Sequence, residues 1–146
     1  MAEIVTEFKI RNASSEDILE ILKIEEEHTG PNPTLEQKIN QMINDENSYF
    51  LVATFKGKIV GYAGGIIRDT EFGTNENIGY ITHVGLSKEF TSKGMGRMLG
   101  DKLIEAMLDK CEIFRTILGF DRADLQSFFN HLGFKRTDLL VYESKY

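Results

Sequence analysis

Two glycines stand two positions apart at the start of a segment that otherwise has the pattern of a helix, T-S-K-G-M-G-R-M-L-G-D-K-L-I-E-A-M, residues 91–107. Glycine is the poorest helix former after proline, so Gly94 and Gly96 weaken the turn that they open. The first turn of a helix, however, offers unpaired backbone N–H groups and positive charge, and glycine leaves those groups uncovered. Because Lys93 and Arg97 are basic, this segment could hold a diphosphate; a tight turn without a ligand is the alternative.

Two common phosphate-binding motifs do not fit this segment. A Walker A loop has four residues between its glycines and then Lys-Ser or Lys-Thr, and G-M-G-R has neither feature. Gly94, Gly96 and Gly100 come closer to a Rossmann fingerprint, with Asp121 after the next predicted strand. That fold requires several more strand–helix units, and few residues of this sequence follow Asp121. A dinucleotide domain is therefore not expected.

The composition is typical of one globular domain, residues 1–146, since 41% of the residues are hydrophobic and 27% are charged. A formal net charge of −6 without a long basic run argues against a nucleic-acid partner. Cys111 is the only cysteine, which excludes an internal disulfide, and with three scattered histidines the sequence predicts no metal site. Without a signal-peptide pattern or a long apolar run, we expect a cytoplasmic protein without membrane contact, monomeric or homodimeric.

The hydrophobic pattern predicts a mixed sheet with helices, of class α/β or α+β. Alternating patterns and glycine turns predict strands at 7–11, 48–55, 58–68, 78–86, 113–120 and 134–146. Helical spacing predicts helices from Ser14 or Ser15 to about 28–33, from Thr34 to about 44–47, over 95–107 and over 121–134. The clearest patterns are the hairpin around Lys56-Gly57 and the stripe of Met95, Leu99, Leu103 and Met107.

Taken together, several motifs resemble the GNAT superfamily of acetyl-CoA-dependent N-acetyltransferases. These motifs are a strand ending V-G-L, the connection S-K-E-F, the loop T-S-K-G-M-G-R, an amphipathic helix, a strand and a short helix ending F-F-N-H-L-G-F. The resemblance extends over the whole chain and is strongest from Ile78 to Phe134. It implies the GNAT fold, with about six to seven strands in a mixed twisted sheet flanked by about four helices.

The resemblance also implies the position of the acetyl-CoA site. The family loop reads Gln/Arg-x-x-Gly-x-Gly/Ala, and its amides hold the pyrophosphate of coenzyme A; Gly94 and Gly96 match, whereas Thr91 replaces Gln or Arg. The pantetheine arm would lie between the fourth and fifth strands, and the backbone N–H of Leu86 would meet the thioester carbonyl. The residues expected at acetyl-CoA are Val84, Gly85, Leu86, Thr91, Ser92, Lys93, Gly94, Met95, Gly96, Arg97, Arg122 and Phe129.

Several residues are candidates for the base that must deprotonate the attacking amine. The positions where the family carries Glu or His match Tyr80 and Thr82, and neither is a good base. His83 is the only histidine on this strand, but strand alternation directs it to the opposite face unless a bulge intervenes. Glu71 and Glu76 in the preceding loop could act through an ordered water, which Tyr80 could help to hold.

The family's general acid is absent from this sequence. Many members have a Tyr four residues before the glycine of L-G-F, where this chain has Phe129, which cannot donate a proton. The neighbouring Asn of many members is replaced by Arg122 or Asp121. These departures keep a second hypothesis open, a non-catalytic acyl-CoA-binding or regulatory module. A third is an unrelated α/β interaction domain whose glycines only turn the chain.

The acceptor is expected to be a primary amine, whether a small amine, a lysine or a peptide N-terminus. By resemblance, the segments H-T-G-P-N-P-T (28–34) and D-T-E-F-G-T-N-E-N (69–77) form the walls of the acceptor site. Acidic residues in and beside them would suit a cationic acceptor. These acidic residues are Glu25, Glu26, Glu27, Asp69, Glu71 and Glu76.

Overall fold

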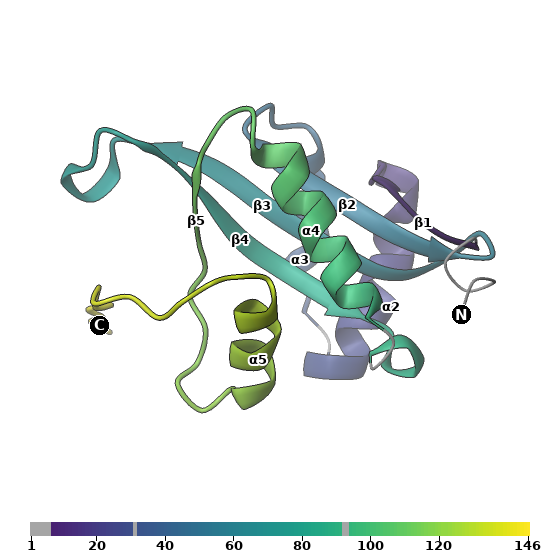
Figure 1. Ribbon diagram of the computed structural model, residues 1–146. Helices are drawn as coiled ribbons and strands as arrows, with labels where there is room; N and C mark the ends of the chain where they lie inside the picture. The colour runs from purple at the N-terminus through teal and green to yellow at the C-terminus, as the bar shows by residue number, and fades with distance from the viewer. Residues whose placement is uncertain (1–6, 31, 92–93) are drawn as a thin grey trace.

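The protein forms a mixed five-stranded sheet with helices on both faces (Figure 1). The computed structural model describes residues 7–30, 32–91 and 94–146. The strands are β1 (Phe8–Asn12), β2 (Ser48–Phe55), β3 (Lys58–Asp69), β4 (Asn77–Leu86) and β5 (Ile113–Arg115). The helices are α2 (Ile18–Thr29), α3 (Leu35–Ile43), α4 (Met95–Met107) and α5 (Ala123–His131), with 3-10 turns at Ser15–Asp17, Glu71–Gly73 and Lys88–Phe90.

The strands lie in the order β1-β2-β3-β4-β5, antiparallel from β1 to β4 and parallel between β4 and β5. A short turn joins β2 to β3 and a loop joins β3 to β4, whereas α2 and α3 lie between β1 and β2 in the chain. α4 makes the crossover from β4 to β5, as a parallel pair requires. In Figure 1, α4 crosses one face of the sheet while α2 and α3 lie behind the other. The predicted mixed-sheet class is therefore confirmed.

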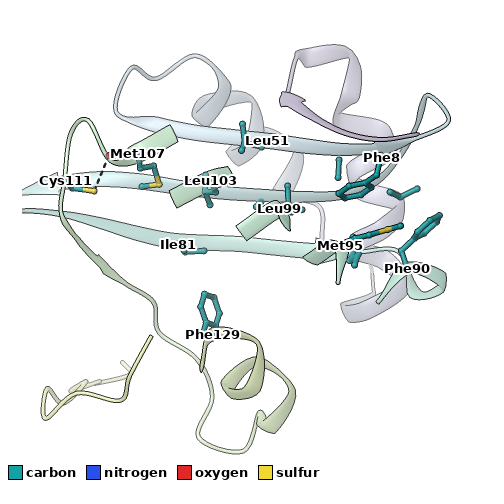
Figure 2. Close-up of a cluster of buried hydrophobic side chains, with 14 residues drawn as sticks. Phe8, Leu51, Ile81, Phe90, Met95, Leu99, Leu103, Met107, Cys111 and Phe129 are labelled. Atoms are coloured by element: carbon teal, nitrogen blue, oxygen red, sulfur yellow. Dashed lines mark hydrogen bonds between the residues drawn. The ribbon is translucent and has the colours of Figure 1, made fainter. Parts of the chain in front are cut away.

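The core consists of two layers of buried side chains, one on each face of the sheet. On one face, the predicted stripe of α4 is fully buried against β2, β3 and β4 (Figure 2). On the other face, Ile21 of α2 and Ile39 of α3 pack with Phe50 and Tyr62. Each fully buried large side chain contributes roughly 1.5–3 kcal/mol. The two layers therefore fix the sheet between α4 and the α2–α3 pair.

The C-terminal part of the chain departs from the sequence-based expectation. The structure has five strands in its described residues, not six to seven, because the strand predicted at 113–120 ends at Arg115 and residues 134–146 form no strand. After Arg115 the chain turns away from β4, and Thr116 Oγ1 donates to the carbonyl of Ile81 at 2.9 Å. A three-residue β5 offers few backbone groups for a further strand to pair with. Leu140 and Val141 are accordingly exposed.

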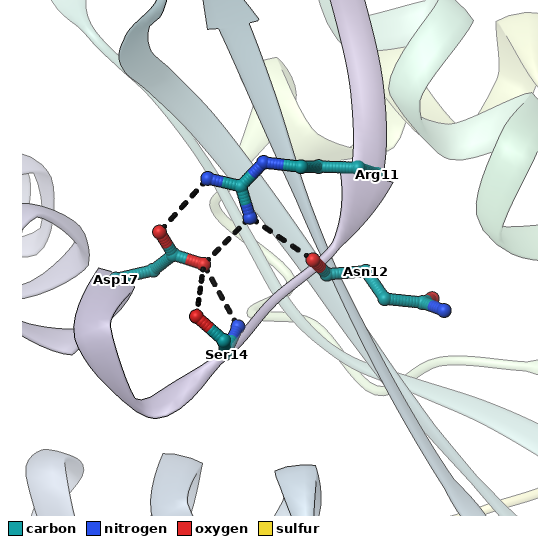
Figure 3. A network of polar contacts seen from close by, with 4 residues as sticks. All are labelled: Arg11, Asn12, Ser14 and Asp17. Carbon is teal, nitrogen blue, oxygen red and sulfur yellow. Dashed lines mark hydrogen bonds and ion pairs between the residues drawn. The ribbon is translucent and has the colours of Figure 1, made fainter.

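A buried carboxylate joins β1 to the start of α2 (Figure 3). Asp17 is only 6% exposed, and both of its oxygens accept hydrogen bonds from the guanidinium of Arg11, at 2.7 and 2.9 Å. The backbone N–H of Ser14 donates to the same carboxylate at 2.8 Å. Paired donors of this kind stabilise the ionised form. The hydrogen bonds from Arg11 lower the pKa of Asp17.

We expect Asp17→Asn to lower the free energy of unfolding by about 1.5–3 kcal/mol at neutral pH, since it removes charged hydrogen bonds. Because the pKa of Asp17 is lowered by folding, its stabilisation is complete above the unfolded value of about 3.9 and is lost as pH falls through the folded value. Urea denaturation at neutral and acidic pH should therefore show a difference that shrinks in acid. Asp101→Asn, at an exposed carboxylate 4.0 Å from Arg97, is the control. Equal losses in both variants would contradict the prediction.

Candidate functional site

The C-terminal end of β4 is open on one side. β4 and β5 pair only from Ile78 and Ile113 to Tyr80 and Arg115, and then separate. At the end of β4, the N–H of Ser87 donates to the carbonyl of Val60 at 2.7 Å. Since pairing groups alternate along an antiparallel ladder, the N–H groups of Val84 and Leu86 point away from β3. They face the side that β5 has left.

The N-terminus of α4 carries uncovered backbone amides. Gly94 is its N-cap, with a φ of 76° that favours glycine, and no side chain caps the helix. The first N–H with a helical partner is that of Met98, bonded to the carbonyl of Gly94. The amides of Met95, Gly96 and Arg97 therefore have no acceptor within the helix. Ser92 and Lys93, predicted at the same site, lie outside the described residues.

The start of α4 lies next to the end of β4. A side chain added at Gly96 would come within 3.8 Å of Leu86 and 3.2 Å of the Phe128 ring. Gly96 therefore faces the protein, and a bulkier residue would disturb the packing of α5 as well as any ligand. The Val84–Leu86 end of β4 and the first turn of α4 are brought together as the sequence predicts.

A bulge in β4 decides which way His83 points. β3 pairs Gly65 with Ile81 but Gly64 with His83, so Thr82 is an extra residue on β4. Ile81 packs on the α4 side, whereas the His83 ring lies 5.9 Å from that of Phe50 on the α2–α3 side. Tyr80, which alternates with Ile81, shares the face of His83. The bulge thus produces the arrangement that regular alternation excluded.

His83 is half-buried and makes a side-chain polar contact. Its Nδ1 lies 2.7 Å from Thr82 Oγ1. Burial lowers the pKa of His83, although the charge of Glu25 opposes the shift. This shift favours the neutral form of the ring. His83 also lies three residues before Leu86, which is roughly 10 Å along a strand.

Glu25 and Tyr62 form a polar contact beside the end of β4. The Tyr62 hydroxyl donates to the Glu25 carboxylate, and burial with this hydrogen bond raises the pKa of Tyr62. An alanine Cβ at position 85 would lie 2.4 Å from the Tyr62 ring. Glycine at position 85 is therefore needed for Tyr62 to reach Glu25. The contact places an acidic side chain of α2 against the end of β4.

Four more residues predicted at the site have different surroundings, and two of them lie far from Leu86 along β4. Glu76 precedes β4 and Tyr80 lies near its start, so extended geometry separates them from Leu86 by roughly 30 and 20 Å. Arg122 is exposed and pairs with Asp124, lowering the pKa of that carboxyl to about 2. Phe129 is buried, with its ring against Phe128 and Phe134. The structure therefore does not bring Glu76 or Tyr80 together with Leu86.

Sequence reasoning missed His28, at the end of α2. Its Nε2 lies 2.6 Å from the carbonyl oxygen of Leu86, 58 residues away in the chain. The neighbouring Glu27 carboxylate accepts a hydrogen bond from the N–H of Lys88 at 3.2 Å. These contacts join the last turn of α2 to the end of β4. The one signal for His28 in the sequence was its position in segment 28–34, the expected wall of the acceptor site.

Two cavities lie at the opposite end of the sheet. One, of about 340 Å³, is lined by polar residues including Asn47, Asp69 and Lys110, and the other, of about 440 Å³, lies beside it between 75–77 and 108–113. Neither includes Leu86 or the start of α4. In the described ranges 7–30, 32–91 and 94–146, no group of three His, Cys, Asp or Glu side chains could hold a metal ion.

The amino-acid sequence matches the model of one known protein family over most of its length. The model of the acetyltransferase (GNAT) family matches residues 15–134. The chain belongs to the GNAT acetyltransferase family. It is accordingly an acetyl-CoA-dependent N-acetyltransferase by family, which confirms the resemblance seen in the sequence. The open end of β4 and the bare first turn of α4 lie within the matched residues of this GNAT domain.

Solved structures show the same fold at low sequence identity. A protein from Bacillus halodurans C-125 described as a transcriptional regulator superposes with a TM-score of 0.81 at 18% identity, covering 94% of this chain and 99% of that one. Two aminoglycoside 6'-N-acetyltransferases, AAC(6')-Ig from Acinetobacter haemolyticus and AAC(6')-Ih from Acinetobacter baumannii, each superpose with a TM-score of 0.80. The identities are 20% and 19%, and the matches cover 94% and 95% of this chain and 98% of each enzyme. These likenesses establish the GNAT fold.

Among the described helices of the GNAT domain, none combines the length and the apolar character needed to cross a bilayer.

Proposed function

We propose that this GNAT domain transfers the acetyl group of acetyl-CoA directly to a primary amine of a cationic acceptor, at the open end of β4. The observation that carries the proposal is the juxtaposition of two sets of backbone amides for which the described residues provide no acceptor. The first turn of α4 offers the N–H groups of residues 95–97, and β4 directs the N–H groups of Val84 and Leu86 to its open side. A single extended ligand with a diphosphate at one end could contact both sets.

The residues present fit coenzyme A. An uncapped helix start attracts a diphosphate through its amides and dipole, and the exposed guanidinium of Arg97 adds charge. The outward amides of β4 suit an amide-containing arm that lies beside the strand, as an added strand would. Acetyl-CoA, when bound, supplies an activated acetyl carbonyl. The N–H of Leu86 would stabilise the negative charge that develops on its oxygen.

The acceptor would approach from the α2 side of β4. The last turns of α2 carry Glu25, Glu26 and Glu27. Glu25 contacts Tyr62 of β3, which pairs with Gly85, and Glu27 contacts the N–H of Lys88 in the turn after β4. A local excess of negative charge attracts ammonium groups and concentrates them at the site. The loop acids Asp69, Glu71 and Glu76 lie at the other end of β4, so the α2 acids support a cationic acceptor better.

The environment of the single cysteine fits direct transfer of the acetyl group, without an acyl-cysteine intermediate. Cys111 is buried, and burial raises the pKa of its thiol, so a reactive thiolate is disfavoured. It also follows α4, at the far end of that helix from Gly94. The structure therefore supports positioning of amine and thioester against each other, without a covalent acyl-enzyme.

A second candidate function, acyl-CoA binding without turnover, is favoured by one specific observation. Phe129 occupies the position of the general acid in many GNAT enzymes, and here it belongs to the core cluster on the α4 side. It offers no proton to a departing thiolate. On this second reading the diphosphate and pantetheine contacts are retained, and the acetyl group is not transferred.

Release of CoA thiol with a panel of amines tests the proposed function. The panel contains spermidine, an aminoglycoside, a lysine peptide, a free peptide N-terminus and an arylamine, which is uncharged at neutral pH, at equal concentrations. We expect turnover that is highest with polycationic amines and that falls with increasing salt, because the α2 carboxylates act through charge. Highest turnover with the neutral amine would contradict a cationic acceptor. Acetyl-CoA binding by calorimetry without turnover on any amine would favour the binding module.

A further inference from the structure

We propose that His28 is the general base that takes a proton from the acceptor amine; this proposal deepens the proposed function and rests on it. His28 Nε2 lies 2.6 Å from the carbonyl oxygen of Leu86. A carbonyl oxygen only accepts hydrogen bonds, so Nε2 must carry the proton. In the neutral ring, Nδ1 then bears a lone pair. The Leu86 carbonyl thus orients the imidazole and makes Nδ1 the nitrogen that can accept a proton.

The contact places the ring beside the reacting atoms. The N–H and C=O of one strand residue point to the same edge, so the carbonyl that binds His28 and the N–H proposed for the thioester oxygen are both on the open side of β4. His28 is exposed, and within the described part of the chain only its Nε2 has a hydrogen-bond partner. Nδ1 is therefore accessible to an amine and can return its proton to water.

The charged groups near His28 are those of the elements packed at this corner. Glu25 and Glu27 lie on the same helix, with Glu25 bound to Tyr62 and Glu27 bound to the N–H of Lys88. These carboxylates can hold an incoming ammonium near the ring. His83 is a weaker candidate, because it is half-buried, lies farther from Leu86 along β4, and uses Nδ1 in a contact with Thr82.

His28 would act in the step that transfers the acetyl group to the amine. The acceptor enters as an ammonium, and His28 Nδ1 takes one proton from it, which frees the nitrogen lone pair. That pair forms the C–N bond to the acetyl carbon, and the C–S bond breaks with its electrons left on sulfur. The second proton of the nitrogen passes to the sulfur, and the imidazolium of His28 releases its proton to water. The products are the acetylated amine and free thiol.

Two substitutions separate a base from a positioning contact. In His28→Gln, the side-chain amide can donate a hydrogen bond to the Leu86 carbonyl but cannot take a proton. His28→Ala loses both the hydrogen bond and the base. We expect kcat/KM to fall about 100- to 10,000-fold in both variants, the range for a general base, with loss of the acid limb of the pH–rate profile. The dissociation constant of acetyl-CoA should stay unchanged in His28→Gln. His131→Gln is the matched control, since that exposed histidine also contacts a carbonyl, that of Ser127.

Near-parental activity of His28→Gln with loss in His28→Ala would overturn the base role and leave only positioning of Leu86. Loss of acetyl-CoA affinity in His28→Gln would also overturn it. A second readout needs no turnover: nitrogen chemical shifts of labelled histidine should show that the neutral form of His28 is protonated at Nε2 and bare at Nδ1. The opposite tautomer would overturn the proposal. If the parental protein acetylates no amine, the proposed function fails, and the tautomer still decides whether His28 has the geometry of a base.

Discussion

Replacing Arg97 with proline is expected to weaken acetyl-CoA binding far more than replacing it with alanine. Arg97 is the third residue of α4, and its N–H has no acceptor within the helix. Alanine removes only an exposed charge, worth up to about 1 kcal/mol or fivefold in affinity. Proline also removes the N–H, and a hydrogen bond to a charged group contributes about 1.5–3 kcal/mol, a further 10- to 150-fold. Calorimetric titration of both variants with acetyl-CoA measures the difference.

The control for the proline is a second proline in an equivalent position. Gln37 is the exposed third residue of α3, and its N–H also precedes the first helical hydrogen bond, from Lys38 to Thr34. Gln37→Pro should lower the melting temperature about as much as Arg97→Pro and leave acetyl-CoA affinity unchanged. Equal affinities of Arg97→Pro and Arg97→Ala would exclude the amide of Arg97 from the diphosphate site.

Gly85→Ala is expected to destabilise the fold by about 1–3 kcal/mol, the usual range for overpacking a core. The added methyl group would lie 2.4 Å from the Tyr62 ring, and that ring cannot move aside easily. Tyr62 is 1% exposed, stacks on Phe50 with 5.9 Å between ring centroids, and bonds to Glu25. The same change should reduce acetyl transfer, since it pushes Tyr62 and Glu25 away from the end of β4.

A double-mutant cycle with Tyr62→Leu tests this interpretation. Tyr62→Leu alone should be destabilising, because it loses a buried ring and its hydrogen bond. In Gly85→Ala/Tyr62→Leu the clash is relieved, so the two losses should be less than additive. Urea denaturation of the four proteins gives the coupling energy. Additive losses, or a Gly85→Ala variant as stable as the parent, would show that position 85 has more space than the structure indicates.

Local patterns predicted the helices and the hairpin correctly, because neighbouring residues determine them. The stripe of α4 is buried as its spacing required, and the turn at Lys56 and Gly57 joins β2 to β3. Thr34 and Gln37 have the spacing of a capping box, but Asn32 accepts the hydrogen bonds of the Thr34 N–H and hydroxyl, and no side-chain hydrogen bond caps α3. The N–H of Thr34 could donate to Asn32 or to Gln37, and the spacing of the residues does not show which acceptor it uses.

The site depended on contacts between distant residues, which no local pattern records. The glycine stretch predicted an exposed helix start, because glycines leave amides uncovered wherever the helix lies. His28 meets Leu86 only because α2 packs across the sheet, and the bulge at Thr82 reverses the face of His83. β5 ends where the chain separates from β4, after Arg115. The apolar run 113–120 continues past this point and does not show where the separation occurs.

The most direct test of the central claim is a titration of backbone amide chemical shifts with acetyl-CoA. We expect the chemical shifts of the Met95, Gly96 and Arg97 amides to change most, both with CoA and with its adenosine diphosphate portion alone. The amide of Leu86 should shift strongly only when the acetyl-pantetheine arm is present. Shifts concentrated around Asp109 and Lys110, at the two cavities, with residues 86 and 95–97 unmoved, would contradict the claim that acetyl-CoA binds between the end of β4 and the start of α4.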